Sequence, residues 1–168
     1  MGNSNRDTIG INDCQILAHY KYEADQYILT LSSKEISETT QPGQFVHLSV
    51  SGMLAMRRPI SVMSVDKENG TFDLLYKIVG EGTRQLADRK IGDMLSVIGP
   101  IGNGFQMTDK KIPLLIGGGV GMPPIIAIAQ NIKDNDYFSP YVILGSEVPF
   151  PFDTVSSNLG GFYSSKIH

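Results

Sequence analysis

The sequence is poor in cysteine and in net positive charge, and both shortages exclude functions. Cys14 is the only cysteine among 168 residues, so the chain can form neither an internal disulfide nor a multi-cysteine metal cluster of its own. Its formal net charge is −3, whereas proteins that bind a nucleic-acid backbone carry a basic face. We therefore expect no nucleic-acid partner, and the cysteine usage fits a reducing compartment such as the cytoplasm.

The sequence also lacks the signals of export and membrane insertion. The opening residues, "MGNSNRDTIGIND", contain no apolar core of a signal peptide, and Arg6 stands where a myristoylation pattern has Ser or Thr. Residues 112–129 form an uncharged run of membrane length. That run contains three consecutive glycines and Pro123-Pro124, which would break a spanning helix. We therefore expect a soluble, cytoplasmic protein.

Residues 14–98 have the pattern of short β-strands separated by turns. The strand segments are apolar, rich in β-branched residues and partly alternating, and the dipeptide Asn69-Gly70 is a strong hairpin signal. The six predicted strands are residues 14–20, 26–32, 44–50, 59–65, 71–79 and 93–99. Strands at this spacing predict an all-β antiparallel barrel of the Greek-key kind. One helix is expected, at residues 82–89.

The pattern changes after about residue 108. The stretch "KIPLLIGGG" is an unalternating apolar run into glycine, which is typical of a strand buried on both faces. Residues 123–135 then have a helical pattern with prolines in the first turn, and "YVILG" predicts another strand. We therefore expect a βαβ unit and a boundary near residues 105–111, which gives domains 1–108 and 109–168.

The second of these domains is incomplete by this interpretation. Residues 146–168 show no useful strand or helix period, and a lone βαβ unit cannot bury both faces of its sheet. We therefore expect residues 111–168 to be either partly disordered or packed against a second chain, which is another copy of this chain or a partner.

Two adjacent arginines in the apolar stretch "MLAMRRPISVMSV" mark a first candidate site. An arginine fork matches a pyrophosphate bidentately, Pro59 fixes the local backbone, and the Ser61 hydroxyl can reach another part of the same ligand. The alternative is an edge strand that carries two solvated arginines.

Two glycine-rich segments are further candidates. In "YKIVGEGTRQLA", Gly82 and Thr83 open the expected short helix, where free backbone N–H groups can bind an anion; the alternative is an ordinary turn capped by Thr83. In "LLIGGGVGMPP", the glycines permit close approach to a dinucleotide between a strand and a helix, although Met122 breaks the strict G-x-G-x-x-G pattern. Here the alternative is a tight turn without a ligand.

The order of these motifs is more specific than any one of them. A barrel, then R-P-x-S, G-x-G-T, "GPIGNGF" and G-x-G-x-G-x-x-P resembles the ferredoxin–NADP reductase superfamily. Within it, "MRRPISV", "YKIVGEGTRQLA" and "VIGPIGNGF" are most similar to the electron-transfer subunits of heteromeric dihydroorotate dehydrogenases. The resemblance covers roughly residues 12–146.

The resemblance implies FAD on the barrel and a nicotinamide nucleotide, NAD(P)H, on the second domain. By position, it implies that Arg58 binds the pyrophosphate and that Ser61 lies near the reactive edge of the flavin as a catalytic residue. Further positions that match the family's cofactor-binding segments are Pro59, Ile60, Leu75, Tyr76, Lys77, Gly82, Thr83, Gly117, Gly118, Gly119, Gly121 and Pro124. The implied partner is a catalytic dihydroorotate dehydrogenase subunit.

The sequence departs from that subunit type in two respects that bear on function. The distal strands of the nucleotide domain are absent, which bears on tight nicotinamide binding, and so are the cysteines of an iron–sulfur centre. The resemblance implies four C-terminal cysteines for a [2Fe–2S] centre, and this chain has only Cys14, so we expect no such centre here. Two functions stay open: a flavin module that passes electrons from NAD(P)H to a partner, or a truncated non-catalytic homologue that binds FAD or other proteins. Glu147 is a candidate acceptor for a ribose hydroxyl, and the scattered His19, His47 and His168 are interpreted as structural or solvated.

Overall fold

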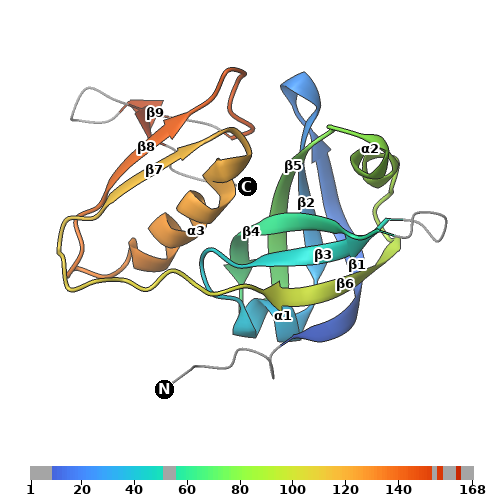
Figure 1. Ribbon diagram of the computed structural model, residues 1–168, viewed down its shortest axis with the longest axis horizontal. Coiled ribbons are helices and arrows are strands. Elements are labelled where there is room, and N and C mark those ends of the chain that lie inside the picture. Colours follow the sequence, from blue (N-terminus) through green and yellow to red (C-terminus); the bar gives the residue numbers. More distant parts are fainter. Residues whose placement is uncertain (1–8, 51–55, 153–154, 157–161, 164–168) are drawn as a thin grey trace.

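The first half of the chain folds into a closed antiparallel barrel (Figure 1). The structure, a computed structural model, describes residues 9–50, 56–152, 155–156 and 162–163. The barrel strands are β1 (Gly10–Lys21), β2 (Gln26–Ser32), β3 (Phe45–Ser49), β4 (Arg58–Asp66), β5 (Thr71–Lys77) and β6 (Met94–Ile101). Their order around the barrel, β1-β2-β5-β4-β3-β6, confirms the predicted Greek-key arrangement of six strands.

The barrel is stable because alternate side chains of each strand meet in its interior. Successive strand residues point to opposite faces, and on β5 the inward residues Phe72, Leu74 and Tyr76 are each at most 4 % exposed. Gly70, at a φ of +67°, lies in the turn between β4 and β5, as the Asn69-Gly70 signal predicted.

Two short helices add one buried side chain each to this core. Helix α1 (Lys34–Thr39) begins where Ser33 Oγ accepts the Ile36 N–H at 3.2 Å, and Ile36 is fully buried. Helix α2 (Glu81–Ala87) contributes Leu86, which is also fully buried. The sequence predicted α2 but not α1, because six residues are too few to show a helical period. A single 3-10 turn, η2 (Glu23–Asp25), joins β1 to β2.

The second half forms the predicted βαβ unit. Strands β7 (Leu114–Gly118) and β8 (Tyr141–Gly145) are parallel, and the turn η3 (Gly119–Gly121) leads from β7 into helix α3 (Met122–Ile132). Helix α3 lies between this sheet and the barrel (Figure 1). A buried apolar cluster joins the two halves; it contains Ile28, Met63 and Leu75 from the barrel and Met122 and Ile126 from α3.

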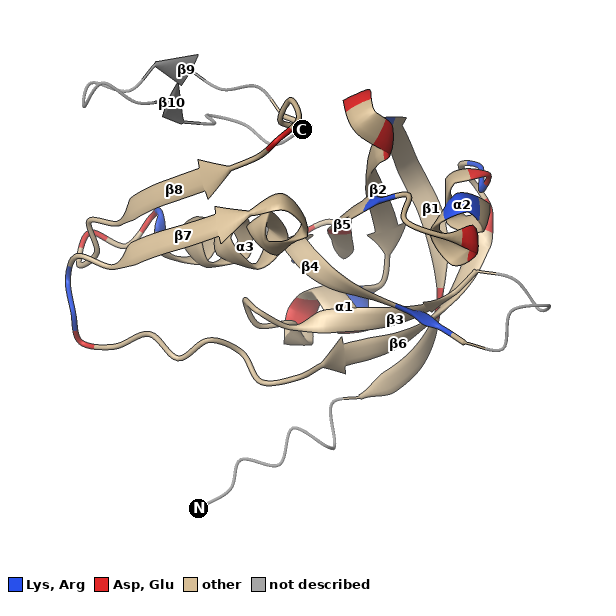
Figure 2. Cartoon of the chain, turned by 45° about the horizontal axis from the view of Figure 1, so that its top comes forward, with Lys and Arg blue, Asp and Glu red and all other residues tan. Residues whose placement is uncertain are grey.

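The sheet of the second half is buried on one face only, so the expectation that the "LLIGGG" strand is buried on both faces is wrong. Leu115 packs under α3 and is 8 % exposed, whereas Leu114 and Ile116 are 59 % and 62 % exposed. On β8, Tyr141 and Ile143 are also more than half exposed. Figure 2 shows hardly any charge on β7, β8 and α3. The uncovered face is therefore apolar.

The segment after β8 turns back to the barrel. Gln26 Nε2 donates to the Pro149 carbonyl at 2.9 Å, and the rings of Phe150 and Phe152 stack with centroids 5.3 Å apart. Two short strands, β9 (Val155–Ser156) and β10 (Phe162–Tyr163), pair antiparallel; two residues each leave no period to predict. No helix in the described ranges is long and apolar enough to cross a membrane.

Candidate functional site

The two adjacent arginines have different surroundings. Arg57 reaches across β3 to β6, where Nη1 donates to the Ser96 carbonyl at 2.7 Å and Nη2 donates to the Ser96 hydroxyl at 3.0 Å. Charge-assisted bonds of this kind are stronger than those between neutral groups. Arg57 therefore links the start of β4 to β6, and both of its terminal nitrogens are engaged by Ser96.

Arg58 forms no hydrogen bond or ion pair with any residue that the structure describes. Its half-buried side chain lies against the start of α2, so that a Cβ placed at Gly82 would be only 2.7 Å from Arg58 Nη2. Figure 2 shows the basic start of β4 at the same end of the barrel as α2. The structure thus brings together Arg58 and Gly82, two predicted site residues 24 positions apart, and leaves the guanidinium free to bind an anion.

The turn before α2 is held in place by Thr83. The Thr83 hydroxyl accepts the N–H groups of Val79 and Gly80 at 2.9 and 3.2 Å, and it donates to the Gly80 carbonyl at 3.0 Å. These bonds occupy the hydroxyl. The Thr83 side chain therefore caps the first turn of α2, which is the role that the sequence offered as the alternative.

A second group of predicted residues lines a cavity between the two halves. This glycine-loop cavity has a volume of about 600 Å³. Its lining residues are Gln26, Leu75, Tyr76, Lys77, Gly118, Gly119, Val120, Gly145, Ser146, Glu147 and Val148. The predicted flavin-side segment of β5 and the predicted nucleotide loop after β7 are therefore two walls of one space.

The glycines of this loop are required for different reasons. A Cβ at Gly117 would be 2.8 Å from Ile125 Cγ1, so that residue permits the close packing of β7 on α3. Gly119 has a φ of +52°, in the left-handed region that side chains disfavour. Gly121 and Pro124 lie at the start of α3, but neither contributes to the cavity lining.

The remaining residues of the "RPIS" motif divide between the two faces of β4. Ile60 is 7 % exposed and belongs to the barrel core, whereas Pro59 is exposed opposite His47. Ser61 is half-buried, and its hydroxyl has no hydrogen-bond partner within the described part of the chain. The hydroxyl is therefore available to a ligand, although Ser61 does not line the glycine-loop cavity.

Tyr76 contributes to the cavity wall while its ring belongs to the barrel interior. The Tyr76 hydroxyl is 2.8 Å from His19 Nε2, and the Tyr76 ring stacks on Tyr27 with centroids 5.2 Å apart. Burial raises the pKa of Tyr76 above its usual range and lowers the pKa of His19, against a smaller opposing effect of its bond to the Arg89 carbonyl. The structural interpretation of His19 agrees with these contacts.

Gln26 is a lining residue that the sequence analysis did not identify. It is 5 % exposed, and its donation to Pro149 holds the segment after β8 against the barrel. Nothing in the local sequence distinguishes it from any strand glutamine. Glu147, which the sequence suggested, does lie in the same cavity wall. In the described ranges, no group of three or more His, Cys, Asp or Glu side chains is placed to hold a metal ion.

Comparison with known proteins identifies the family. The model for the oxidoreductase FAD-binding domain matches residues 14–105. The chain belongs to this family. The match covers nearly all of the barrel, Arg58 and α2. The residues there fit FAD, because the Arg58 guanidinium, which has no partner among the described residues, lies directly against Gly82 in the first turn of α2, where a Cβ would collide with it. The expectation of an FAD-binding oxidoreductase module is confirmed.

Individual members of the family are similar to this chain beyond the shared domain type. The electron transfer subunits of dihydroorotate dehydrogenase B (NAD(+)) from Bacillus cereus strain B4264 and Bacillus anthracis strain A0248 are each 41% identical to it over 111 residues. That alignment covers 63% of this chain and 43% of each relative. The chain thus matches less than half the length of these relatives, and the resemblance to this subunit type is confirmed over the aligned part.

Solved structures agree with the fold. The NADH-dependent reduced ferredoxin–NADP oxidoreductase, studied for flavin-based electron bifurcation, superposes with a TM-score of 0.75 at 30% identity and covers 83% of this chain and 50% of that one. The ferredoxin reductase of carbazole 1,9a-dioxygenase superposes with a TM-score of 0.71 at 23% identity, over 84% of this chain and 44% of that one. The predicted fold, a barrel followed by a small α/β region, is therefore confirmed.

Proposed function

We propose that the chain is a flavin electron-transfer module in which residues 1–108 hold FAD and residues 109–168 receive NAD(P)H. Arg58 and the backbone around Gly82 and Thr83 are the proposed pyrophosphate ligands, and the Leu75–Lys77 segment runs beside the flavin. The glycine segment from the end of β7 through η3, Gly117 to Gly121, together with Pro124 is the proposed nicotinamide-nucleotide site.

One observation supports the pyrophosphate position above all others. Arg58 is a half-buried residue whose guanidinium has no partner in the described structure and lies directly against Gly82 in the first turn of α2. A charge in such a position is costly unless it is paired, and a dianionic pyrophosphate supplies two acceptors in the geometry of the arginine fork. The guanidinium of Arg57 beside it is held by Ser96 on β6, so we assign Arg57 a structural role and Arg58 the binding role.

The redox chemistry belongs to the cofactor, since a bound FAD takes up two electrons as a hydride and releases them singly. The protein residues position it and exclude water. We assign Ser61 as the catalytic residue, because its unpartnered hydroxyl is a hydrogen-bond donor on the same strand as Arg58. Glu147, in the wall of the glycine-loop cavity, is a proposed acceptor for a ribose hydroxyl, which favours NADH over NADPH.

The proposed electron acceptor is a separate protein. The chain's curated relatives are electron transfer subunits of dihydroorotate dehydrogenase B, and we propose a catalytic subunit of that kind as the partner. The apolar face of β7 and β8 is the proposed contact surface for this partner or for a second copy of the chain. For the location we retain the cytoplasm that the cysteine usage favours.

Arg58→Ala tests the proposal, with Arg57→Ala and Arg58→Lys as matched variants. Loss of charge-assisted bonds to a phosphate is expected to weaken FAD binding by about 2 kcal/mol or more, which is roughly 30-fold. Arg58→Lys keeps the charge but not the fork and falls between wild type and Arg58→Ala. Arg57→Ala leaves FAD affinity nearly unchanged and lowers barrel stability instead.

Quenching of flavin fluorescence on titration with the purified apoprotein measures these affinities. Equal FAD affinity in the wild type and in Arg58→Ala would place the pyrophosphate elsewhere. A larger loss in Arg57→Ala than in Arg58→Ala, with both variants folded by far-UV circular dichroism, would reverse the assignment of the two arginines.

A further inference from the structure

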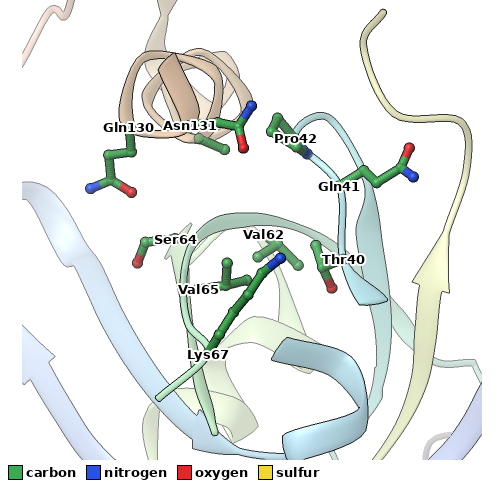
Figure 3. Close-up of a pocket in the computed structure, with 10 residues that line it drawn as sticks. Thr40, Gln41, Pro42, Val62, Ser64, Val65, Lys67, Gln130 and Asn131 are labelled. Atoms are coloured by element: carbon green, nitrogen blue, oxygen red, sulfur yellow. The ribbon is translucent and has the colours of Figure 1, made fainter. Parts of the chain in front are cut away.

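A separate cavity lies between the barrel and the C-terminal half of α3. It has a volume of about 290 Å³, and we call it the junction cavity (Figure 3). Its lining residues are Thr40, Gln41, Pro42, Val62, Ser64, Val65, Lys67, Ala127, Gln130 and Asn131. None of them lines the glycine-loop cavity or belongs to the Arg58 and Gly82 group. The proposed flavin and nicotinamide sites therefore do not account for this space.

Three polar side chains of the junction cavity, Lys67, Gln130 and Asn131, are hydrogen-bond donors without a partner among the described residues, whereas the hydroxyls of Thr40 and Ser64 donate to other protein groups. Lys67 extends from the end of β4 into the cavity, while Gln130 and Asn131 come from α3 on the opposite side (Figure 3). Within the described ranges, none of these three side chains forms a hydrogen bond or an ion pair. An ammonium group and two carboxamides thus border one space, with Lys67 and Asn131 exposed and Gln130 half-buried.

The charge of the lining selects an anion. Lys67 is the only charged residue among those that line the junction cavity. The carboxylate behind the wall, Asp73, is engaged by two hydroxyls, with Ser64 Oγ at 2.5 Å and Thr30 Oγ1 at 2.7 Å. The Ser64 hydroxyl donates its proton to Asp73, so it can offer a ligand in the cavity only an acceptor. Lys67 consequently has no acidic group in the lining to neutralise it.

The rest of the lining is apolar and limits the size of an occupant. Pro42, Val62, Val65 and Ala127 provide the carbon surface. At roughly 30 Å³ for each water-sized group, a volume of about 290 Å³ accommodates about ten non-hydrogen atoms. Small-molecule sites commonly combine such an apolar wall with a few polar groups that fix orientation.

We propose that the junction cavity binds a small organic carboxylate, with its carboxylate on Lys67 and the carboxamides of α3 and its apolar body against Val62, Val65 and Ala127. The ligand bridges β4 of the barrel and α3. Because α3 begins directly after the glycine loop, an occupant at its other end steadies the position of α3 against the barrel. This site is independent of the proposed FAD function, and its test needs no flavin.

Benzoate, which has nine non-hydrogen atoms and one carboxylate, is the probe. Isothermal titration of the purified full-length chain is expected to show benzoate binding, and at least about ten-fold weaker binding of uncharged benzamide, because the charge-assisted bonds are lost. Lys67→Gln is expected to reduce benzoate affinity by a similar factor. Ala127→Leu, which fills the cavity, abolishes binding. Lys90→Gln, on an exposed lysine after α2, is the matched control and retains it.

Each contrary result overturns the proposal. No heat of binding at 50 mM benzoate means that the cavity is not a site for such ligands. Equal affinity for benzoate and benzamide rules out anion selection by Lys67. Equal losses in Lys67→Gln and Lys90→Gln mean that binding follows net charge rather than this cavity. If benzoate causes the same amide chemical-shift changes in Ala127→Leu as in wild type, the ligand binds elsewhere. The same spectra show whether the variant is folded.

Discussion

The barrel and the βαβ half of this chain differ in whether every described strand has a neighbouring strand on both sides. Every barrel strand has a neighbour on both sides, because β6 pairs with β1 and closes the sheet. In the second half, β7 and β8 pair only with each other among the described strands. One face of this pair is covered by α3, while Ile116 and Ile143 on the other face are more than half exposed.

This difference separates what the chain can do alone from what needs a partner. A closed barrel removes its edges and buries a continuous core, so the Arg58 and Gly82 group rests on a rigid frame. The second half contributes only one wall of the glycine-loop cavity, carried by a sheet whose two strands pair only with each other in the described part of the chain. We infer that binding of FAD depends on the barrel and that full nicotinamide binding depends on further contacts to β7 and β8.

Truncation of the barrel core should have the largest effect and is the direct test of this contrast. Leu74→Ala removes a fully buried side chain and is expected to lower the free energy of unfolding by about 3 kcal/mol. The matched change Ile116→Ala, on the open face, is expected to cost less than about 0.5 kcal/mol. Denaturation with urea measures both values. Equal losses would show that the open face is buried in solution.

Bulk at the start of α2 should have the next largest effect, on FAD rather than on stability. Gly82→Val places a branched side chain where the Arg58 guanidinium lies, and FAD affinity is expected to fall at least about ten-fold, since the arginine must move. Gly80→Ala is the matched control, because a Cβ there meets nothing within 4 Å and its φ of −176° is extended backbone. Fluorescence titration compares the two. Comparable FAD binding by both variants would identify the segment as a simple turn.

Much of this fold could be read from the sequence where a local period or a turn signal existed. Alternation and Asn69-Gly70 located the barrel strands, and "YVILG" matches β8 residue for residue. Helix α1 and the strands β9 and β10 were missed because they are too short to have a period. The burial of β7 was misjudged because a continuous apolar run does not show which of its faces a neighbour covers.

The candidate site also contains residues that the sequence could identify and residues that it could not. Arg58 and Gly82 were identified by residue type, and the structure shows them side by side. The role of Arg57 could not be predicted, since its partner Ser96 is 39 residues away and nothing in the local pattern connects them. Gln26 was missed for the same reason, because its partner Pro149 is 123 positions away. Local sequence thus indicates which groups can bind a ligand, while tertiary contacts decide which of them remain free.

The open face should support association, with a smaller effect. If Ile116 and Ile143 pack against a second copy of the chain, Ile116→Lys places a charge in that contact and is expected to weaken self-association at least about ten-fold. Ile11→Lys is the matched control, because Ile11 is 73 % exposed on the barrel. Sedimentation equilibrium over a range of concentrations measures the change. A monomer at all concentrations in wild type would leave a different partner protein as the occupant of this face.

The smallest expected effect is a pH dependence of barrel stability that arises from His19. Its Nδ1 lies 3.0 Å from the Arg89 carbonyl, which can only accept, so Nδ1 carries the proton and neutral Nε2 accepts the Tyr76 hydroxyl. Burial lowers the pKa of His19 below its ordinary 6.5, and the unfolded chain therefore binds more protons just below that pH. Stability should be constant above about pH 6.5 with respect to His19, and it should fall as the pH drops from there toward the lowered pKa.

His19→Gln removes this part of the slope, whereas His47→Gln leaves His19 intact and retains it. Urea denaturation of the three proteins from pH 7.5 to pH 5 gives the comparison. Parallel stability curves for wild type and His19→Gln would mean that His19 titrates alike in the folded and unfolded chain, and that its contacts with Arg89 and Tyr76 do not favour the neutral ring.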